Sequence, residues 1–402
     1  MNTKKVFSSI EMLFLLSPMI VLLTMAFTIP DAKSIISRLV PVVVIYCLVR
    51  YRSEIKESFH NPLIRFFFLI SVMYIVYGAV LMLVCGEQFG PYRSLLTSTI
   101  YLIVLPWHRF SREHIYMLAS IGGVAAGVYA IYVTQIIGQA KASSVVNPIP
   151  FALYCLLCFL FSIHACLSSP LSKTHTIFAL GLLGSISAIF LSGVRGIWIA
   201  LPVVIALVIM LNKRWSLRYK SIFAISVLVI LSSLGFYFKD SLEARVAQTK
   251  WEFSRISQGN LESSVGWRLG MWEVGYNWVK ESPLLGIGYS QIKPKAERDD
   301  LNERVRFYIT NSHFHNQFID ILVRNGLLGL VIFLFWLLLP AYLLATKAKS
   351  HDRALGYSCL AGILIASLTD VPFHHTHIMY TYSFLIGSLL LVNLANPLSE
   401  EY

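Results

Sequence analysis

The sequence predicts an all-α polytopic membrane protein with about twelve transmembrane helices and one large polar loop. Hydrophobic residues make up 56% of the 402 residues and charged residues only 13%, whereas a soluble domain carries about 25% charged residues. Apolar runs long enough for a helix to cross a bilayer recur along most of the chain. Since only residues 239–317 form a long polar segment, we expect no separate soluble enzymatic domain.

Twelve apolar runs are candidate spans, and they divide the chain into 1–238, the polar loop 239–317 and 318–402. The first run follows Lys4 and Lys5, as in a signal peptide, but its length and the spans after it favour a retained helix. The run that ends at residue 346 is long, and we expect a short interfacial helix through Asn325 followed by a span from Gly326. The candidate spans are 9–29, 35–50, 63–84, 94–108, 114–138, 148–168, 176–193, 196–212, 220–238, 318–346, 354–371 and 376–395.

The Lys and Arg residues favour one orientation in the membrane. With the N-terminus in the cytoplasm, cytoplasmic segments hold fifteen cations and the short loops on the other side hold four, which follows the positive-inside rule. Both termini are then cytoplasmic and the loop 239–317 faces outward. Its eleven Lys and Arg residues nearly balance ten Asp and Glu residues, so it has no basic field for nucleic acid.

The polar loop is predicted to carry two amphipathic helices. Residues from Ser241 to Ser257 and from Gly266 to Lys280 place apolar side chains at helical spacing. Pro283 ends the second helix, and Gly286-Ile-Gly288 predicts a tight connection. We expect both helices to lie against the membrane or the bundle.

Three side chains at the outward-facing side could carry chemistry. His315 stands just before the tenth predicted span, where an imidazole could transfer a proton or only donate a hydrogen bond. Arg195 lies between two spans, where it must face protein, water or an anion, or else snorkel as an anchor. Arg268 begins the second loop helix and suits phosphate oxygens, unless it pairs with a neighbour such as Glu273. Two arginines and a histidine without an acidic pair fit a diphosphate better than a bare sugar.

Four other charged residues have simpler interpretations. Asp320 and Arg324 are four residues apart and are expected to pair along one helix face. Arg38 and Arg93 lie near the outer face, where they add positive potential for an anionic substrate or serve as ordinary anchors.

No metal, cofactor or disulfide framework is expected. The six cysteines lie in or next to apolar runs, and the CxxC pair Cys155 and Cys158 sits inside one of them, which favours packing. A histidine-rich cluster could supply metal ligands, but a run of adjacent histidines does not specify a coordination geometry. The cluster consists of Asp370, His374, His375 and His377, to which His313 and His315 could be added.

Nucleotide-dependent chemistry has no signature in the chain. No P-loop, GxGxxG fingerprint or GxSxG elbow occurs where it would need to be, and a site on the outer face would have no ATP. The energy must then come from the substrate itself, which indicates an activated lipid-linked donor.

The motif around His315 resembles that of the O-antigen ligases, which complete lipopolysaccharide. His315-Asn316, nine further residues and Gly326-Leu-Leu-Gly329 fit the family pattern H-[NSQ]-x9-G-x-x-G at every fixed position. The segments LSGVRGIWIAL around Arg195 and VGWRLGMWEVG around Arg268 resemble two arginine-containing segments of the same family.

The resemblance implies a GT-C-like helical fold in the bacterial inner membrane and a metal-independent, inverting glycosyltransferase whose active site faces the periplasm. The donor would be a glycan on undecaprenyl diphosphate, the acceptor a sugar hydroxyl of the lipid A-core, and the only other partner membrane lipid. His315 would match the family's essential histidine, and Arg195 and Arg268 its diphosphate-contacting arginines. Further candidates for binding the diphosphate or the acceptor are Asn316, His313, Arg93 and Arg38.

Two alternatives remain open at this point. O-antigen polymerases of the same superfamily tend to show two large outer loops with R-x10-G elements. This chain has one such loop, and the single match at Arg255 and Gly266 is expected by chance. A non-enzymatic lipid or sugar transporter should instead place polar residues at mid-bilayer and show inverted repeats.

Overall fold

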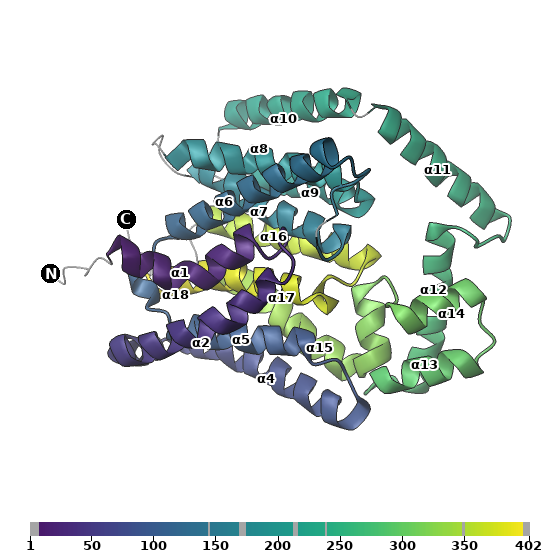
Figure 1. Cartoon of the computed structure of the whole chain (residues 1–402), viewed down its shortest axis with the longest axis horizontal. Helices are drawn as coiled ribbons and strands as arrows, with labels where there is room; N and C mark the ends of the chain where they lie inside the picture. The colour runs from purple at the N-terminus through teal and green to yellow at the C-terminus, as the bar shows by residue number, and fades with distance from the viewer. Residues whose placement is uncertain are drawn as a thin grey trace.

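The computed structural model describes residues 8–143, 145–168, 174–211, 216–237, 239–347 and 350–396, and all regular structure in these ranges is helical (Figure 1). Lys4 and Lys5 lie outside the described residues. The helices before the polar loop are α1 (Ser9–Thr24), α2 (Ala32–Arg50), α3 (Arg52–Ser58), α4 (Pro62–Cys85), α5 (Gly90–Val104), η1 (Trp107–Arg109), α6 (Arg112–Ile131), η2 (Tyr132–Ile136), α7 (Pro148–Ser168), α8 (Thr174–Ser192), α9 (Arg195–Leu211) and α10 (Leu217–Tyr237). The helices from the loop onward are α11 (Lys239–Ser257), α12 (Ser264–Glu281), α13 (Tyr289–Arg298), α14 (Glu303–Asn311), α15 (Gln317–Lys347), α16 (Ser350–Thr369), η3 (Pro372–His374), α17 (Thr376–Tyr382), η4 (Ser383–Gly387) and α18 (Ser388–Ala395).

Each of the twelve predicted spans coincides with a helix or a run of helices, although several boundaries differ. For example, α1 ends at Thr24, and α5 already begins at Gly90, where Pro91 occupies the first turn. Among the described residues, seven helical segments are long and apolar enough to cross a membrane, so the chain is a polytopic membrane protein while the count of twelve remains a prediction. The seven are Ala32–Arg50, Pro62–Cys85, Arg112–Ile136, Pro148–Ser168, Thr174–Ser192, Gln317–Thr346 and Thr376–Ala395, and Ser9–Thr24 and Arg195–Leu211 are shorter apolar helices.

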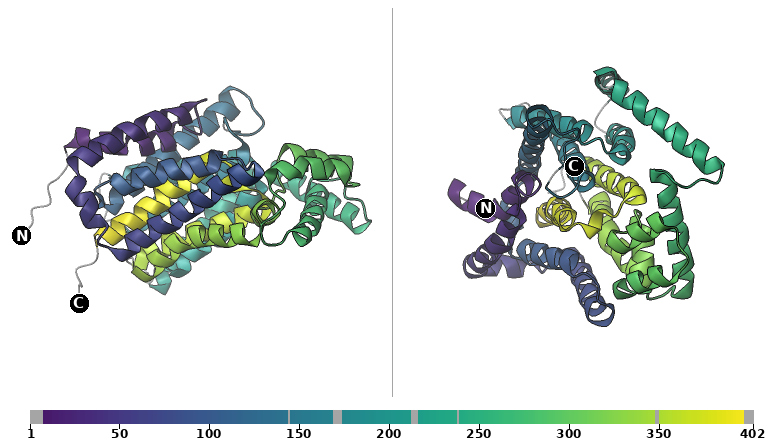
Figure 2. Two further views of the ribbon diagram at one scale, coloured as in Figure 1. Left: turned by 90° about the horizontal axis from the view of Figure 1, so that it is seen from below. Right: turned by 45° about the vertical axis from the view of Figure 1, so that its right-hand side comes forward.

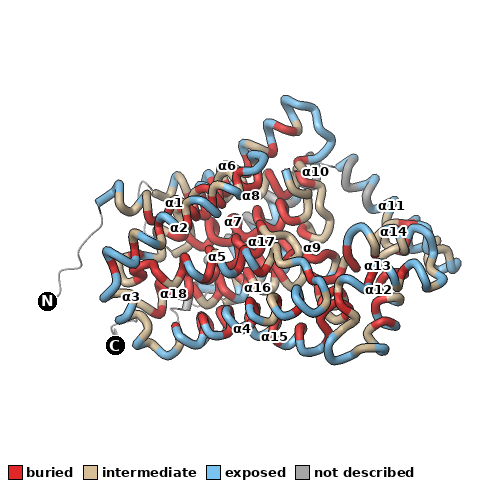
Figure 3. Tube along the Cα trace, turned by 60° about the horizontal axis from the view of Figure 1, so that its bottom comes forward, coloured by how far each residue is buried: buried red, intermediate tan, exposed pale blue. Residues whose placement is uncertain are grey.

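The centre of the bundle is formed by α7 and by the run from α17 to α18, which are buried along almost their whole length (Figure 3). Both segments are apolar on every side, as expected of helices surrounded by other helices. The start of α1 and the end of α18 lie at one end of the bundle, and α12, α13 and α14 lie at the other (Figure 2). This arrangement requires an even number of passes through the bundle, as in the predicted topology.

The polar loop folds as a small helical unit with its own core. The two predicted helices are present as α11 and α12, and Ser263 caps α12 by accepting a hydrogen bond from the Gly266 N–H at 3.0 Å. Helices α13 and α14 were not predicted, because both are short and polar. They pack with α12 around a second group of buried apolar side chains that includes Met271, Trp278 and Phe314.

The loop unit joins the bundle where α15 is interrupted. Gly326 has φ 65° and ψ −170°, a conformation that is essentially restricted to glycine, which confirms the expected break between a short helix through Asn325 and a following span. At the break, the backbones of 283–288 and 323–328 cross closely. Four hydrogen bonds connect them: Ile287 N–H to Val323 O, Gly288 N–H to Arg324 O, Leu327 N–H to Pro283 O and Leu328 N–H to Leu284 O, all between 2.8 and 3.1 Å.

Candidate active site

His315 lies in the short connection between α14 and α15, at the end of the bundle that carries the loop unit. Its φ of 49° places it in the left-handed region, which costs a residue other than glycine about 1–3 kcal/mol and persists only where the surroundings impose it. One such constraint is Phe314, which is fully buried and packs against Trp278 with ring centroids 5.9 Å apart. The His315 side chain itself keeps 19% of its surface exposed, so it is held in place and still accessible.

Asn316 holds the start of α15 and ties it to α16. Its Oδ1 accepts hydrogen bonds from the N–H groups of Phe318 and Ile319 at 3.0 and 3.1 Å, and its Nδ2 donates to the carbonyl of Leu368 at 3.2 Å. Both ends of this buried amide are therefore occupied within the protein. The predicted substrate-binding residue thus has an observed structural task, namely to cap α15 and to bring the end of α16 close to His315.

The predicted pair of Asp320 and Arg324 is confirmed, and it supports the same connection. Arg324 Nε lies 3.0 Å from Asp320 Oδ2, and Arg324 Nη1 lies 3.6 Å from Glu87 Oε1 on the loop before α5. Asp320 Oδ1 accepts the N–H of Phe314 at 3.3 Å, and Arg324 Nη2 donates to the carbonyl of Ser312 at 3.5 Å. All three charged residues are buried, so this network fixes the backbone on either side of His313.

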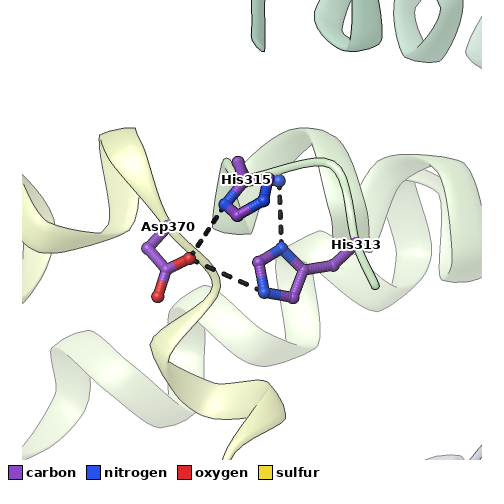
Figure 4. Close-up of side chains that lie close together, drawn as sticks. All are labelled: His313, His315 and Asp370. Carbon is purple, nitrogen blue, oxygen red and sulfur yellow. Dashed lines mark hydrogen bonds and ion pairs between the residues drawn. The ribbon is translucent and has the colours of Figure 1, made fainter. Parts of the chain in front are cut away.

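Asp370, just after α16, meets both histidines of the connection (Figure 4). Its Oδ1 lies 3.2 Å from His315 Nδ1 and 3.6 Å from His313 Nε2. The N–H of His315 donates to His313 Nδ1 at 3.2 Å. This bond leaves the proton of a neutral His313 on Nε2, directed at the carboxylate. The hydrogen bond to Asp370 likewise places a proton on Nδ1 of His315, so that Nε2 of His315 presents its lone pair away from Asp370.

The charges of the three residues follow from their burial. Burial lowers the pKa of His313 to about 4, so this ring is neutral at physiological pH and supports its neighbour as a hydrogen-bonding group. Burial alone would raise the pKa of Asp370, but the hydrogen bond from His315 and the other imidazoles nearby lower it below its usual value. Asp370 is therefore an anion that orients His315 and stabilises it when it gains a proton.

Both predicted arginines lie near this group. Burial lowers the pKa of Arg268, while the charge of Asp370 raises it and the charge of Arg195 lowers it, so Arg268 lies within electrostatic range of both residues. Arg268 makes no ion pair with Glu273, or with any other acidic group among the described residues. Arg195 begins α9 and donates from Nη1 to Thr249 Oγ1 on α11 at 3.1 Å. Arg268 is thus close enough to Asp370 to interact with its charge, and Arg195 lies on the side of α11.

The remaining predicted residues are distributed around the site. His374 and His375 lie in and just after η3, and the ring centroids of His313 and His374 are 5.9 Å apart. Arg38 and Arg93 are both exposed, and in the described part of the chain no contact joins either to the connection that carries His315. Arg93 acts electrostatically on Lys33, whose Nζ donates to Thr376 Oγ1 at 2.9 Å.

One group of side chains could hold a metal ion. Ligand atoms of His313, His315 and Asp370 all lie within 4.8 Å of one another, and two imidazoles with a carboxylate are suitable donors for a transition metal. The same atoms are, however, accounted for by the hydrogen bonds described above. The expectation that the protein works without a metal therefore remains a prediction, and His313, His315 and Asp370 are the residues at which it must be tested.

Asp370 is the site residue to which the sequence assigns no catalytic role. The sequence places it in a histidine-rich cluster without a defined geometry, and the structure pairs it with His315, 55 positions earlier. The available signal was a lone acidic residue at the predicted outward-facing end of an apolar helix, where an unpaired carboxylate would be costly.

The fold and this site define a polytopic membrane protein with a histidine, a carboxylate and two arginines gathered at one end of its bundle. A family model described as O-antigen ligase matches residues 180–334, which include Arg195, Arg268 and His315 but not Asp370. An O-antigen ligase of Escherichia coli (strain K12) is 28% identical over 321 residues, which cover 77% of this chain and 72% of that protein. An uncharacterized protein of Haemophilus influenzae is 25% identical over 323 residues, covering 78% and 79%, and a ComP-specific O-oligosaccharyltransferase of Acinetobacter baylyi is 24% identical over 171 residues, covering 42% and 28%. Over residues 180–334, which hold three of these four site residues, the chain is similar to the O-antigen ligase family.

Proposed function

We propose that the protein is an O-antigen ligase, which moves O-antigen polysaccharide from undecaprenyl diphosphate to the lipid A-core at the periplasmic face of the bacterial inner membrane. The observation that carries this proposal is the His315–Asp370 pair, with Arg268 within electrostatic range of Asp370 and of Arg195. A base and two permanent cations on one side of a membrane bundle are the groups that glycosyl transfer from a lipid diphosphate requires.

A groove between α9 and α11 supports a lipid-linked donor. It is open to the surroundings, has a volume of about 890 Å³ and is lined mainly by apolar side chains, including Ile199, Val203 and Phe253. These three side chains are exposed in the structure. Arg195 and Lys250 also line the groove. An apolar groove with cations in its lining is complementary to an isoprenoid chain with a diphosphate head.

The reaction follows from these positions. Nε2 of His315 accepts the proton of the acceptor hydroxyl, and the hydroxyl oxygen attacks the anomeric carbon of the donor sugar. The bond between that carbon and the diphosphate oxygen breaks, and its electron pair leaves with the diphosphate. Arg195 and Arg268 stabilise the charge on this leaving group, while Asp370 stabilises the imidazolium that forms. Attack from the face opposite the diphosphate inverts the anomeric centre, and no metal is needed in this scheme.

Two other acceptors are compatible with the family. A polymerase would transfer the glycan to a second lipid-linked repeat, and the relatives named O-oligosaccharyltransferases raise the possibility of a protein acceptor. Deleting the gene and separating the lipopolysaccharide on a gel distinguishes these functions. Loss of every capped band with retained lipid-linked polymer supports a ligase, a cap of a single repeat indicates a polymerase, and unchanged lipopolysaccharide refutes both.

The mechanism and the orientation need separate tests. Purified protein, given a lipid diphosphate-linked glycan and a lipid A-core acceptor, is expected to transfer glycan in the presence of a chelator. Activity that disappears with the chelator and returns with a divalent ion would assign His313, His315 and Asp370 to a metal.

The orientation is tested with a cysteine introduced at the exposed Lys293 of α13. It should react in intact cells with a thiol reagent that crosses only the outer membrane, and a cysteine there that reacts only after the inner membrane is opened would refute the orientation.

A further inference from the structure

A second groove lies on the loop unit, outside the part of the chain that is apolar enough to span a membrane. It is open to solvent, has a volume of about 710 Å³, and lies between the α11–α12 connection, one face of α12 and the segment that leads into α14. Helix α12 contributes Trp267, Gly270, Glu273 and Asn277, whose spacing of three to four residues places them on one side of the helix. The adjoining side of α12, which includes Met271 and Trp278, is buried in the core of the unit, so the helix that carries the groove residues is held in place.

The groove presents both hydrogen-bond acceptors and donors. Asn260 and Asn302 use their Oδ1 atoms to accept backbone N–H groups at the starts of the segments that follow them, at 2.9 Å in each case. These bonds orient the amides, while their Nδ2 groups donate to no other described residue. Glu273 and Asp300 are exposed and form no hydrogen bond or ion pair through their side chains with the described residues. Oriented amides beside unpaired carboxylates suit a ligand that is rich in hydroxyl groups, since each hydroxyl both donates and accepts.

The charge of the groove excludes the phosphate part of the substrate. Its lining contains three carboxylates, those of Glu262, Glu273 and Asp300, and no lysine or arginine. Cations border the lining: Arg255 lies 3.4 Å from Glu262, the Arg304 guanidinium lies 5.8 Å from the centroid of the Trp267 ring, and Arg306 donates to the Leu301 carbonyl at 3.3 Å. They offset part of this charge from outside the lining. A phosphorylated or acidic glycan would be repelled here, whereas an uncharged one would not.

Aromatic contacts connect this groove to the proposed catalytic site. The Trp267 ring lies with its centroid 5.7 Å from that of Tyr308, and the Tyr308 ring lies 6.2 Å from that of His315. Arg268 directly follows Trp267 in α12. A sugar chain whose reacting end is at His315 can therefore continue along α12 into the groove.

We propose that this groove binds an uncharged segment of the glycan, one or more sugar units away from the transferred bond, and so selects substrates by the length and charge of their sugar chains. The proposal rests on the proposed glycosyl transfer. The segment belongs either to the donor chain or to the acceptor oligosaccharide, which share the same hydroxyl chemistry.

The test uses the full-length protein with Glu273→Ala and Asn277→Ala combined. Both residues are exposed and neither makes a side-chain hydrogen bond to the described residues, so the fold should be retained. Glu297→Ala on α13, exposed and outside the groove, is the matched control. With neutral glycans of increasing length, loss of the hydrogen bonds from two side chains should raise KM for long glycans about tenfold. The value of kcat, and KM for donors with a single sugar, should stay within about twofold.

Varying the length of the donor chain and of the acceptor chain separately distinguishes the possible occupants of the groove. A higher KM only when the donor chain is long assigns the groove to the donor, and a higher KM only when the acceptor chain is long assigns it to the acceptor. Equal KM values in the double variant and the Glu297→Ala control would refute the groove while leaving the transfer reaction intact. If wild-type protein transfers no glycan, the proposed function fails. The groove is then judged by saturation-transfer NMR with a free neutral oligosaccharide, where binding that the double variant loses supports it and absence of binding refutes it.

Discussion

Replacing Asp370 by Asn tests whether this carboxylate orients the catalytic histidine. The change keeps the size of the side chain and removes its charge at a position that is only 2% exposed. Asp370 Oδ1 is 3.2 Å from His315 Nδ1, and a hydrogen bond to a charged group contributes about 1.5–3 kcal/mol. If this energy is fully realised in the transition state, kcat should fall by roughly 10- to 10²-fold, because each 1.36 kcal/mol corresponds to a factor of ten. A loss of about 10⁴-fold, as known for the equivalent change in Ser-His-Asp enzymes, is the upper limit, reached when the amide selects the wrong imidazole tautomer.

The assay is the initial rate of glycan transfer by purified protein, combined with a double-mutant cycle. His315→Ala removes the base itself and should cost about 10²–10⁴-fold. Because Asp370 acts through His315, the double variant should be no slower than His315→Ala alone. Additive losses would show that Asp370 contributes independently of His315, and full activity of Asp370→Asn would show that the carboxylate has no part in catalysis. His313→Ala serves as the comparison, since His313 approaches the same oxygen only to 3.6 Å, and it should weaken the activity without abolishing it.

Three further outcomes are expected. Arg195→Lys should lose much of the activity at normal protein level, because an ammonium cannot reproduce the two-pronged contact of a guanidinium with a diphosphate, and unchanged ligation would reduce Arg195 to an anchor. Gly326→Ala should lower thermal stability in detergent by about 1–3 kcal/mol or more, since its φ is 65° and a Cβ would lie 2.3 Å from the Leu284 carbonyl oxygen; Gly90→Ala, whose Cβ would meet nothing closer than 3.5 Å, is the control. Burial lowers the pKa of His313 and of His374 from 6.5 to about 4, so the unfolded chain binds protons between these pH values while the native protein does not. Stability should therefore be lost as the pH falls from 6.5 to 4, by up to roughly 3 kcal/mol for His313. His313→Gln should flatten the dependence of the melting temperature on pH, and an unaltered profile in that variant would contradict the assignment.

The parts of the fold that follow from continuous apolar runs could be predicted from the sequence. The spans 148–168 and 376–395 agree with the observed helices to the residue, because such runs are helical wherever backbone groups cannot reach water. Helices α13 and α14 could not be found in this way. Each has only about two to three turns with a mixed polar pattern, and Pro294 lies inside α13, so tertiary packing against α12 determines their conformation.

The candidate site could be predicted only as separate pieces. The spacing from His315 to Gly326 is local, and it identified both the histidine and the break in α15. The approach of Asp370 to His315 depends on how α15 and α16 pack, and the bond from Asn316 to the Leu368 carbonyl, which helps to align them, leaves no mark in the sequence. The φ of 49° at His315 could not be anticipated either, because no glycine or asparagine marks the position.

The crossing of backbones beside Gly326 has a mechanical consequence. Segments 283–288 and 323–328 are joined by four main-chain hydrogen bonds, so α12, α13 and α14 must move together with the first part of α15 and cannot swing away as a hinged cover. Under the proposed function, a donor on a lipid carrier would therefore enter from the bilayer, along the groove lined by α9 and α11.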